Sequence, residues 1–115
     1  MAKTRVLVEF GMGTSLRRAD YTAAAERAIR DALWHNSINM AELFGFPKEA
    51  MIIDAEVAVQ DPDAVDQDRL KAIFPYGQAR VHVKRGGLDV EKPGGGVTVI
   101  ANAALSVSFE LEPTS

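Results

Sequence analysis

The stretch TRVLVEFGMGTSLRRADYTAAAERAIRDAL, residues 4–33, decides the fold because it joins a strand pattern directly to a helix pattern. Residues 4–10 alternate and are rich in β-branched side chains, which is typical of a strand. Residues 21–33 carry an amphipathic helix pattern, and Asp20 is placed to cap that helix. Most of the apolar positions are alanines, so we expect the helix to pack closely on a sheet. These positions are Tyr21, Ala24, Ala25, Ala28, Ile29, Ala32 and Leu33.

Two further strands and a second helix are predicted downstream. Residues 51–59 and 79–85 alternate between apolar and polar side chains, which indicates a strand in each case. Between them, Asp66 is placed to cap a two-turn helix that turns Leu70 inward. Within residues 38–47, the stretch 40–44 is compatible with one short helical turn.

The C-terminal third is predicted to form a hairpin tip followed by a long extended segment. Pro93 and the glycines at 94–96 favour the flexible tip. Residues 97–111 then form either one long strand with a bulge or two strands joined at Asn102. The element order is β-α-β-α-β-β-β, which predicts a single α+β domain over residues 1–115. Its one sheet would have four to five strands, with two helices on one face.

The composition is that of an ordinary soluble domain. The chain has 115 residues, 47% hydrophobic and 25% charged, with a formal net charge of −3. The absence of cysteine excludes disulfide frameworks, thiolate zinc sites and cysteine nucleophiles. No apolar stretch approaches the roughly 18 residues of a membrane helix, and the N-terminus lacks the apolar segment of a secretory signal. We therefore expect a cytoplasmic protein that binds neither membranes nor nucleic acid, because nucleic-acid binding needs a basic patch.

The segment 11–20, between the first strand and the helix, is a candidate anion-binding site. Free amides at a helix N-terminus attract carboxylate or phosphate, and Arg17 and Arg18 add charge and hydrogen-bond donors. Gly11 and Gly13 would let the backbone approach a ligand. The pattern lacks the third glycine of a dinucleotide-binding loop and the ending of a P-loop, so no cofactor is predicted. The alternative is a flexible turn with two solvated arginines.

Polar side chains occupy one face of the predicted strands. Acids lie on the first two strands and bases on the third, so cross-strand ion pairs are expected where these strands are neighbours. Glu56 and His82 are a candidate catalytic pair for proton transfer, because histidine titrates near neutrality. A structural histidine is the alternative. The face itself has three interpretations: a solvated surface, a subunit interface, or the floor of an intersubunit cleft. Its residues are Glu9, Asp54, Glu56, Arg80, His82, Lys84, Ser106, Ser108 and Glu110.

The acid-rich stretch 54–68 does not match a calcium-binding loop. An EF-hand loop starting at Asp61 needs glycine at its sixth position and glutamate at its twelfth, where this chain has Asp66 and Ala72. Turn and helix-cap roles explain these acids, so no metal site is predicted.

Several motifs, spread over nearly the whole chain, carry a resemblance to a known family. They are 9–13, 20–24, 70–77, 86–88 and 99–104. On these residues the chain resembles a small uncharacterised family of conserved hypothetical proteins that begin with a Gly-x-Gly-x-Asp-x-His-Gly motif. Gly11 and Gly13 match that motif, whereas Ser15, Arg17 and Arg18 replace its Asp, His and third Gly. The two arginines in place of these residues favour an anionic ligand.

The element order is also similar to that of small trimeric α+β proteins of the chorismate-mutase type. Those proteins line intersubunit clefts with arginine and bind carboxylated molecules, so the likeness implies a homo-oligomer, although fold alone does not fix function. The first hypothesis is a binder or enzyme for a small anionic metabolite, with its cleft formed by residues 11–18, Asn102 and the polar strand faces. The second is a non-catalytic assembly or protein-interaction module whose polar sheet face is the subunit interface.

Overall fold

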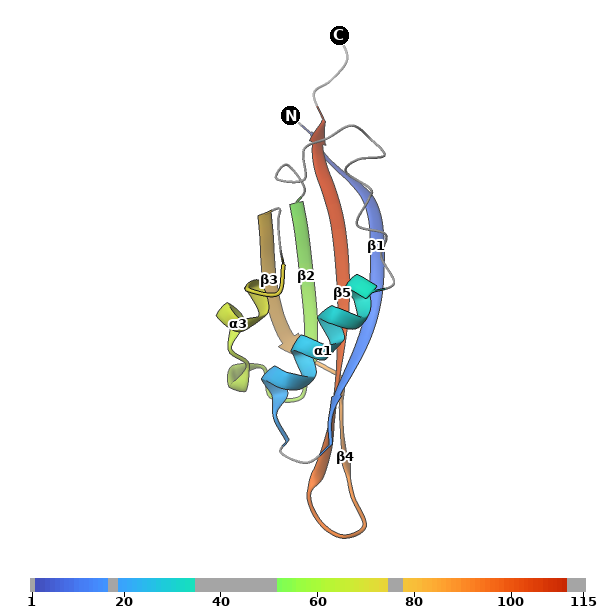
Figure 1. The fold of residues 1–115 in the computed structure, drawn as a ribbon, viewed down its shortest axis with the longest axis vertical. Helices are drawn as coiled ribbons and strands as arrows, with labels where there is room; N and C mark the ends of the chain where they lie inside the picture. Colours follow the sequence, from blue (N-terminus) through green and yellow to red (C-terminus); the bar gives the residue numbers. More distant parts are fainter. Residues whose placement is uncertain (1, 17–18, 35–51, 75–77, 112–115) are drawn as a thin grey trace.

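The computed structural model describes residues 2–16, 19–34, 52–74 and 78–111, which form one sheet with helices packed on it (Figure 1). The predicted α+β class is confirmed: within these ranges, one mixed sheet of five strands carries two α-helices in the expected order. The helical turn predicted at 40–44 lies outside the described residues. The elements are β1 (Ala2–Ser15), α1 (Tyr21–Trp34), β2 (Ile52–Val59), the 3-10 turn η2 (Pro62–Ala64), α3 (Gln67–Lys71), β3 (Gln78–Arg85), β4 (Leu88–Glu91) and β5 (Val97–Leu111).

Strand β5 is the centre of the sheet, whose strand order is β1-β5-β2-β3. It runs antiparallel to β1, β2 and β4, whereas β2 and β3 are parallel. Pairing between β2 and β5 ends at Ala58 and Asn102, and β4 pairs with β5 beyond that point, over residues 97–100. The strands β4 and β5 therefore form a hairpin arm that projects from one end of the sheet (Figure 1).

Residues 97–111 form one continuous strand, which confirms the single strand of the first alternative but not the bulge expected in it. Asn102 lies inside the strand, where it pairs with Met12 of β1. The irregularity in the β1–β5 ladder falls in β1, between Arg5 and Leu7, and not in β5.

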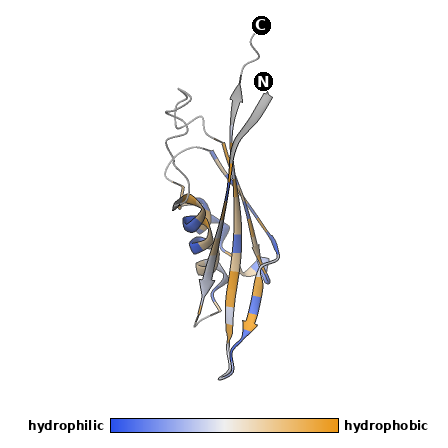
Figure 2. Ribbon diagram, turned by 90° about the vertical axis from the view of Figure 1, so that its right-hand side faces the viewer, coloured by the Kyte–Doolittle hydropathy of each residue, from blue (hydrophilic) through white to orange (hydrophobic). Residues whose placement is uncertain are grey.

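The helices cover one face of the sheet (Figure 2). The predicted apolar side of α1 is confirmed, because its alanines at 24, 25, 28 and 32 and Ile29 are fully buried. They pack with Leu70 of α3 and with the inward residues of the sheet in one core. Among the described residues, no helix is long and apolar enough to cross a membrane. The sheet residues of this core include Ala55, Val57, Val59, Val81, Val99, Ala101, Ala103 and Leu105.

Residues 11–15 belong to strand β1 and not to a loop, which corrects the prediction for the segment 11–20. The glycines there allow α1 to approach the sheet. A Cβ atom at Gly11 would lie 2.2 Å from the carbonyl oxygen of Ala28, and one at Gly13 would lie 2.2 Å from that of Ala24. Because these contacts are with helix backbone, only glycine fits, and the sequence pattern that resembles a turn is a close-packing surface.

The position of these glycines also decides which face of the sheet each β1 side chain occupies. Gly11 and Gly13 face α1, and Glu9 shares their face, opposite the buried Leu105. Glu9 is therefore not on the polar face to which the sequence assigned it. Phe10 lies on the other face and is 70% exposed. Ser108, also predicted to be on the polar face, is buried.

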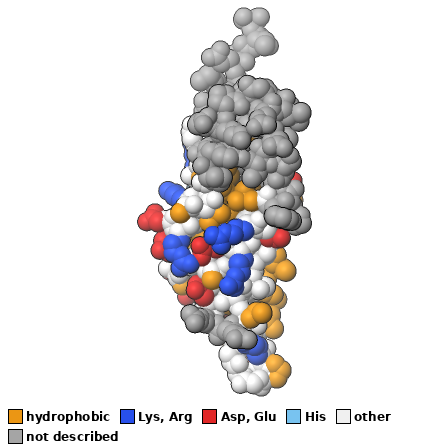
Figure 3. Space-filling view, in the orientation of Figure 1, with side chains coloured by type: hydrophobic (Ala, Val, Ile, Leu, Met, Phe, Trp, Pro, Cys, Tyr) orange, Lys and Arg blue, Asp and Glu red, His pale blue; other side chains and the backbone are white. Residues whose placement is uncertain are grey.

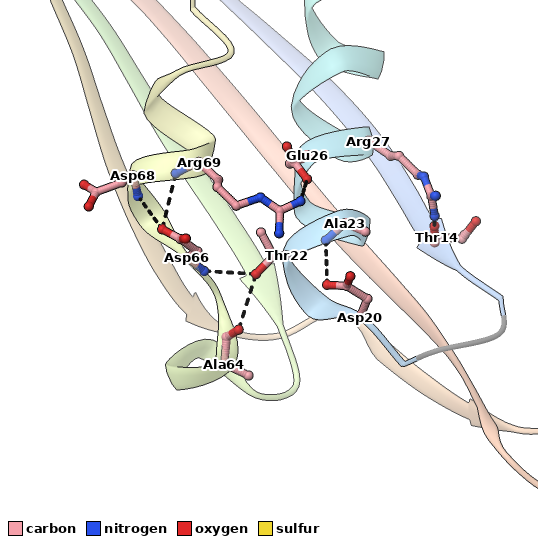
Figure 4. Close-up of polar contacts among 10 residues, drawn as sticks. All are labelled: Thr14, Asp20, Thr22, Ala23, Glu26, Arg27, Ala64, Asp66, Asp68 and Arg69. Carbon is pink, nitrogen blue, oxygen red and sulfur yellow. Dashed lines mark hydrogen bonds and ion pairs between the residues drawn. The ribbon is translucent and has the colours of Figure 1, made fainter.

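Both predicted helix caps are present (Figure 4). The Asp20 carboxylate accepts a hydrogen bond of 3.0 Å from the backbone N–H of Ala23, in the first turn of α1. The Asp66 carboxylate accepts from the backbone N–H groups of Asp68 and Arg69, at 3.1 and 3.3 Å, and so caps α3. Side-chain oxygens thus satisfy donors that a helix start leaves free.

Thr22 ties the start of α1 to the segment that leads into α3 (Figure 4). Its hydroxyl accepts a hydrogen bond of 3.0 Å from the backbone N–H of Asp66 and donates one of 3.3 Å to the carbonyl of Ala64. An ion pair between Arg69 and Glu26 joins the same two elements on the outside. The two helices therefore form one connected layer.

The outer edge of β1 is covered in part by side chains of α1. The backbone N–H of Met12 donates a hydrogen bond of 2.9 Å to the Asp31 carboxylate, and Arg27 donates to the carbonyl of Thr14. An unpaired strand edge attracts other strands, and satisfying its backbone groups removes that attraction.

Candidate functional site: the uncovered face of the sheet

The two faces of the sheet differ in what covers them. The helix-covered face carries charged side chains over α1 and α3 (Figure 3). The opposite face, here called the open face, carries no helix among the described residues (Figure 2). Its side chains belong to two groups, one apolar and one charged.

The apolar group, here called the apolar strip, consists of Phe10, Met12, Leu88 and Val90. Their side chains are 70%, 55%, 54% and 42% exposed. Phe10 and Met12 come from β1, and Leu88 and Val90 come from β4, on the other side of β5. Ile100 of β5 lies between the two strands, because it pairs with Leu88 on one side and with Thr14 on the other. An antiparallel sheet face that meets water is normally polar, and this strip is not.

The charged group, here called the charged block, lies on β2 and β3. Asp54 is opposite Arg80 in the parallel ladder, and Glu56 is opposite His82. Lys84 donates a hydrogen bond of 3.1 Å to Glu56. Both side chains of this ion pair are more than half exposed, so its contribution to stability is about 0–1 kcal/mol. The expected pairing of acids with bases across strands is therefore present. The negative charges of Asp54 and Glu56 equal the positive charges of Arg80 and Lys84 in number.

The predicted proton-transfer pair, Glu56 and His82, lies side by side on this face. Both residues are exposed, and the polar partner of Glu56 is Lys84 instead of His82. A catalytic role for the pair stays a prediction.

The residues of the predicted anion site do not share one face. Gly11 and Gly13 face the α1 backbone, whereas Asn102 is exposed on the open face. Arg17 and Arg18 lie outside the described residues. The N-terminus of α1, where an anion would bind, is occupied by the Asp20 carboxylate. Anion binding here stays a prediction, and no cluster of three metal-binding side chains is found within the described ranges.

A polar contact between α1 and β4 joins two residues that sequence reasoning did not connect. The Tyr21 hydroxyl, at the start of α1, donates a hydrogen bond of 2.5 Å to Asp89 Oδ2 on β4. The other carboxylate oxygen, Asp89 Oδ1, is buried and has no hydrogen-bond partner in the described structure. The two residues are 68 positions apart, and no local pattern links them.

The hydrogen bond to Asp89 is the main reason why the pKa of Tyr21 is raised from 10.0 to about 12, with burial and the negative charges of Asp89 and Asp61 adding to it. A phenol with a raised pKa stabilises the fold fully below pH 10, and this contribution is lost as the pH rises through about 12. The chain has two tyrosines, so Tyr76→Phe leaves Tyr21 as the one that titrates. We expect an ultraviolet titration of this variant to give a pKa of about 12. Adding Asp89→Asn should bring the value back toward 10, and a pKa near 10 without it would contradict the contact.

The fold and the site define a small α+β domain whose sheet is covered by helices on one face and carries no helix on the other within the described residues. The profile of the family described as "Conserved hypothetical protein (Lin0512_fam)" matches residues 5–107, and the chain belongs to this family. The predicted resemblance to a conserved hypothetical family is thereby confirmed.

A similar solved structure is the crystal structure, at 1.22 Å resolution, of an FtsZ-like protein of unknown function from Nostoc punctiforme PCC 73102. It is 33% identical to this chain, with a TM-score of 0.86, and the match covers 96% of this chain and 99% of that one. No curated protein matches.

Proposed function

We propose that the protein is a non-catalytic assembly module whose copies associate through the open face. The observation that supports this proposal is the apolar strip, because it exposes four large apolar side chains on β1 and β4, two strands that both pair with β5. Contiguous exposed apolar residues on a folded protein mark interaction sites. Burying such a side chain fully is worth about 1.5–3 kcal/mol, so the strip supplies a driving force for association.

The charge of the open face favours a second copy of this chain as the partner. Two acids, Asp54 and Glu56, stand beside two permanent bases, Arg80 and Lys84. A patch with balanced charges allows acids of one copy to face bases of another, as a self-complementary interface between identical copies requires. A nucleic acid would need a basic surface instead.

The anion-binding hypothesis is the alternative. In that hypothesis the open face, with Asn102, Glu56 and His82, would floor a cleft between subunits. No observation among the described residues favours it, so it stays a prediction from the sequence.

The mass of the wild-type protein in solution tests the proposal. We expect sedimentation equilibrium, over a hundredfold range of protein concentration, to show a species of at least twice the 12.5 kDa of one chain. High salt should not dissociate it, because salt screens ion pairs and leaves apolar burial intact. A single chain at every concentration would contradict the proposal. Dissociation in high salt would show that ion pairs of the charged block, and not the apolar strip, hold the copies together.

A further inference from the structure

We propose that Tyr21 and Asp89 form an anchor that positions β4 so that Leu88 and Val90 can contact a second copy of the chain. This inference rests on the proposed function, because it assigns a role to two residues that lie outside the interface. They would act on the interface from the other face of the sheet.

The alternation of β4 places the anchor and the interface on opposite faces of one short strand. Asp89 stands between Leu88 and Val90, and it pairs with the buried Val99 of β5. Its carboxylate reaches Tyr21 on the helix-covered side. Leu88 and Val90 point the other way and are 54% and 42% exposed. Fixing Asp89 therefore fixes the backbone that carries half of the apolar strip.

Strand β4 is short and is paired along one edge, so a side-chain contact to α1 adds a restraint that its ladder does not supply. It has four residues, and β5 is its single pairing partner in the described sheet. It follows Gly87, whose φ of +64° lies in the left-handed region, and it ends before a glycine-rich tip. Its flanking residues make further polar contacts: the Gln60 side chain donates to the carbonyls of Gly86 and Gly87, and the Lys92 ammonium donates to the carbonyl of Leu16.

The chemistry of the pair favours a positioning role over a stabilising one. Asp89 keeps one buried oxygen, Oδ1, without a hydrogen-bond partner in the described structure. A buried acceptor without a partner destabilises a fold, and an apolar residue at position 89 would avoid this. A buried polar pair can instead select one arrangement of the chain among several of similar stability. It does so because a charge-assisted hydrogen bond forms only in a narrow range of geometries. The arrangement selected here is the position of the hairpin arm.

The experiment measures association and β4 mobility in Tyr21→Phe, which removes only the hydroxyl, and in Asp89→Asn as a second variant. The matched control is Thr22→Val. Thr22 is the next residue of α1, and its hydroxyl also makes two hydrogen bonds, but these reach residues 64 and 66 and not β4. Sedimentation equilibrium gives the association constant, and hydrogen exchange gives the protection of the amides in β4 (Leu88–Glu91).

We expect Tyr21→Phe and Asp89→Asn to weaken association about tenfold or more and to speed hydrogen exchange in β4. Thr22→Val should lower the unfolding temperature while it leaves the association constant and the β4 exchange unchanged. The anchor would be overturned if the wild type associates and both anchor variants associate as strongly. It would also be overturned if Thr22→Val weakened association equally, because the effect would then follow stability. A wild type that never associates would overturn the proposed function, and this inference with it.

Discussion

Replacing Gly13 with valine is expected to prevent stable folding of the protein. A Cβ atom at this position would lie 2.2 Å from the carbonyl oxygen of Ala24 and 2.3 Å from the nitrogen of Ala28. Both atoms belong to the backbone of α1, so no side-chain rotation relieves the overlap, and the helix must move off the sheet. Separating α1 from β1 would open the core that its fully buried alanines fill.

The expected loss of stability in Gly13→Val is large compared with the total stability of a domain of this size. Overpacking a core side chain costs about 1–3 kcal/mol when neighbours can adjust, and here the neighbour is a whole helix. A small domain has only about 5–15 kcal/mol of stability in total. Urea denaturation followed by circular dichroism measures the loss. The matched control is Gly94→Ala at the hairpin tip, where a Cβ would meet nothing within 4 Å. If the free energy of unfolding of Gly13→Val lay within about 1 kcal/mol of that of the control, α1 would not pack as described.

The second large effect is expected from Leu88→Asp on the open face. Leu88 is 54% exposed in one chain, so an aspartate there should barely change the unfolding temperature. In an assembly through the open face the same carboxylate would be buried without a partner, which is strongly unfavourable. We expect association to weaken by about a hundredfold or more, measured by sedimentation equilibrium.

The matched control for Leu88→Asp is Gln67→Asp, which adds the same negative charge at an exposed position on the helix-covered side. It should associate like the wild type, since position 67 is remote from the apolar strip. Unchanged association in Leu88→Asp would place the interface elsewhere. Weakened association in both variants would attribute the effect to net charge.

The fold could be predicted from the sequence where the signal is periodic and local. The three- and four-residue spacing of α1 identifies its buried side, because that spacing is a property of the helix itself. The Asp66 cap is equally local, since its carboxylate bonds backbone groups two and three residues further on. Both predictions are confirmed by the structure.

The sequence was misleading where a residue type has two uses. Two glycines after a strand pattern are compatible with a turn or with a close approach by another element, and the choice depends on where α1 packs. Once α1 contacts Gly11 and Gly13, the period of two forces Phe10 outward and Glu9 toward the helix layer. The apolar strip therefore could not be found before the packing of α1 was known.

The candidate site also has one part that could be predicted from the sequence and another that could not. The mixture of acids and bases on β2 and β3 follows from strand alternation, but the neighbour of Glu56 depends on the register between two parallel strands. The contact between Tyr21 and Asp89 depends on the hairpin arm folding back beside the start of α1. Neither the register nor the arm position is contained in a short window of sequence.

The coverage of the β1 edge by α1 has a consequence for the shape of any assembly. An approaching strand would find the N–H of Met12 and the C=O of Thr14 already engaged by Asp31 and Arg27. Along that stretch the sheet cannot lengthen by adding a strand from a neighbour, which is how open-ended ribbons grow. Copies joined through their open faces would instead bury their apolar strips against each other. No exposed strip would remain to bind a further copy, so the assembly would stop at a fixed number of subunits.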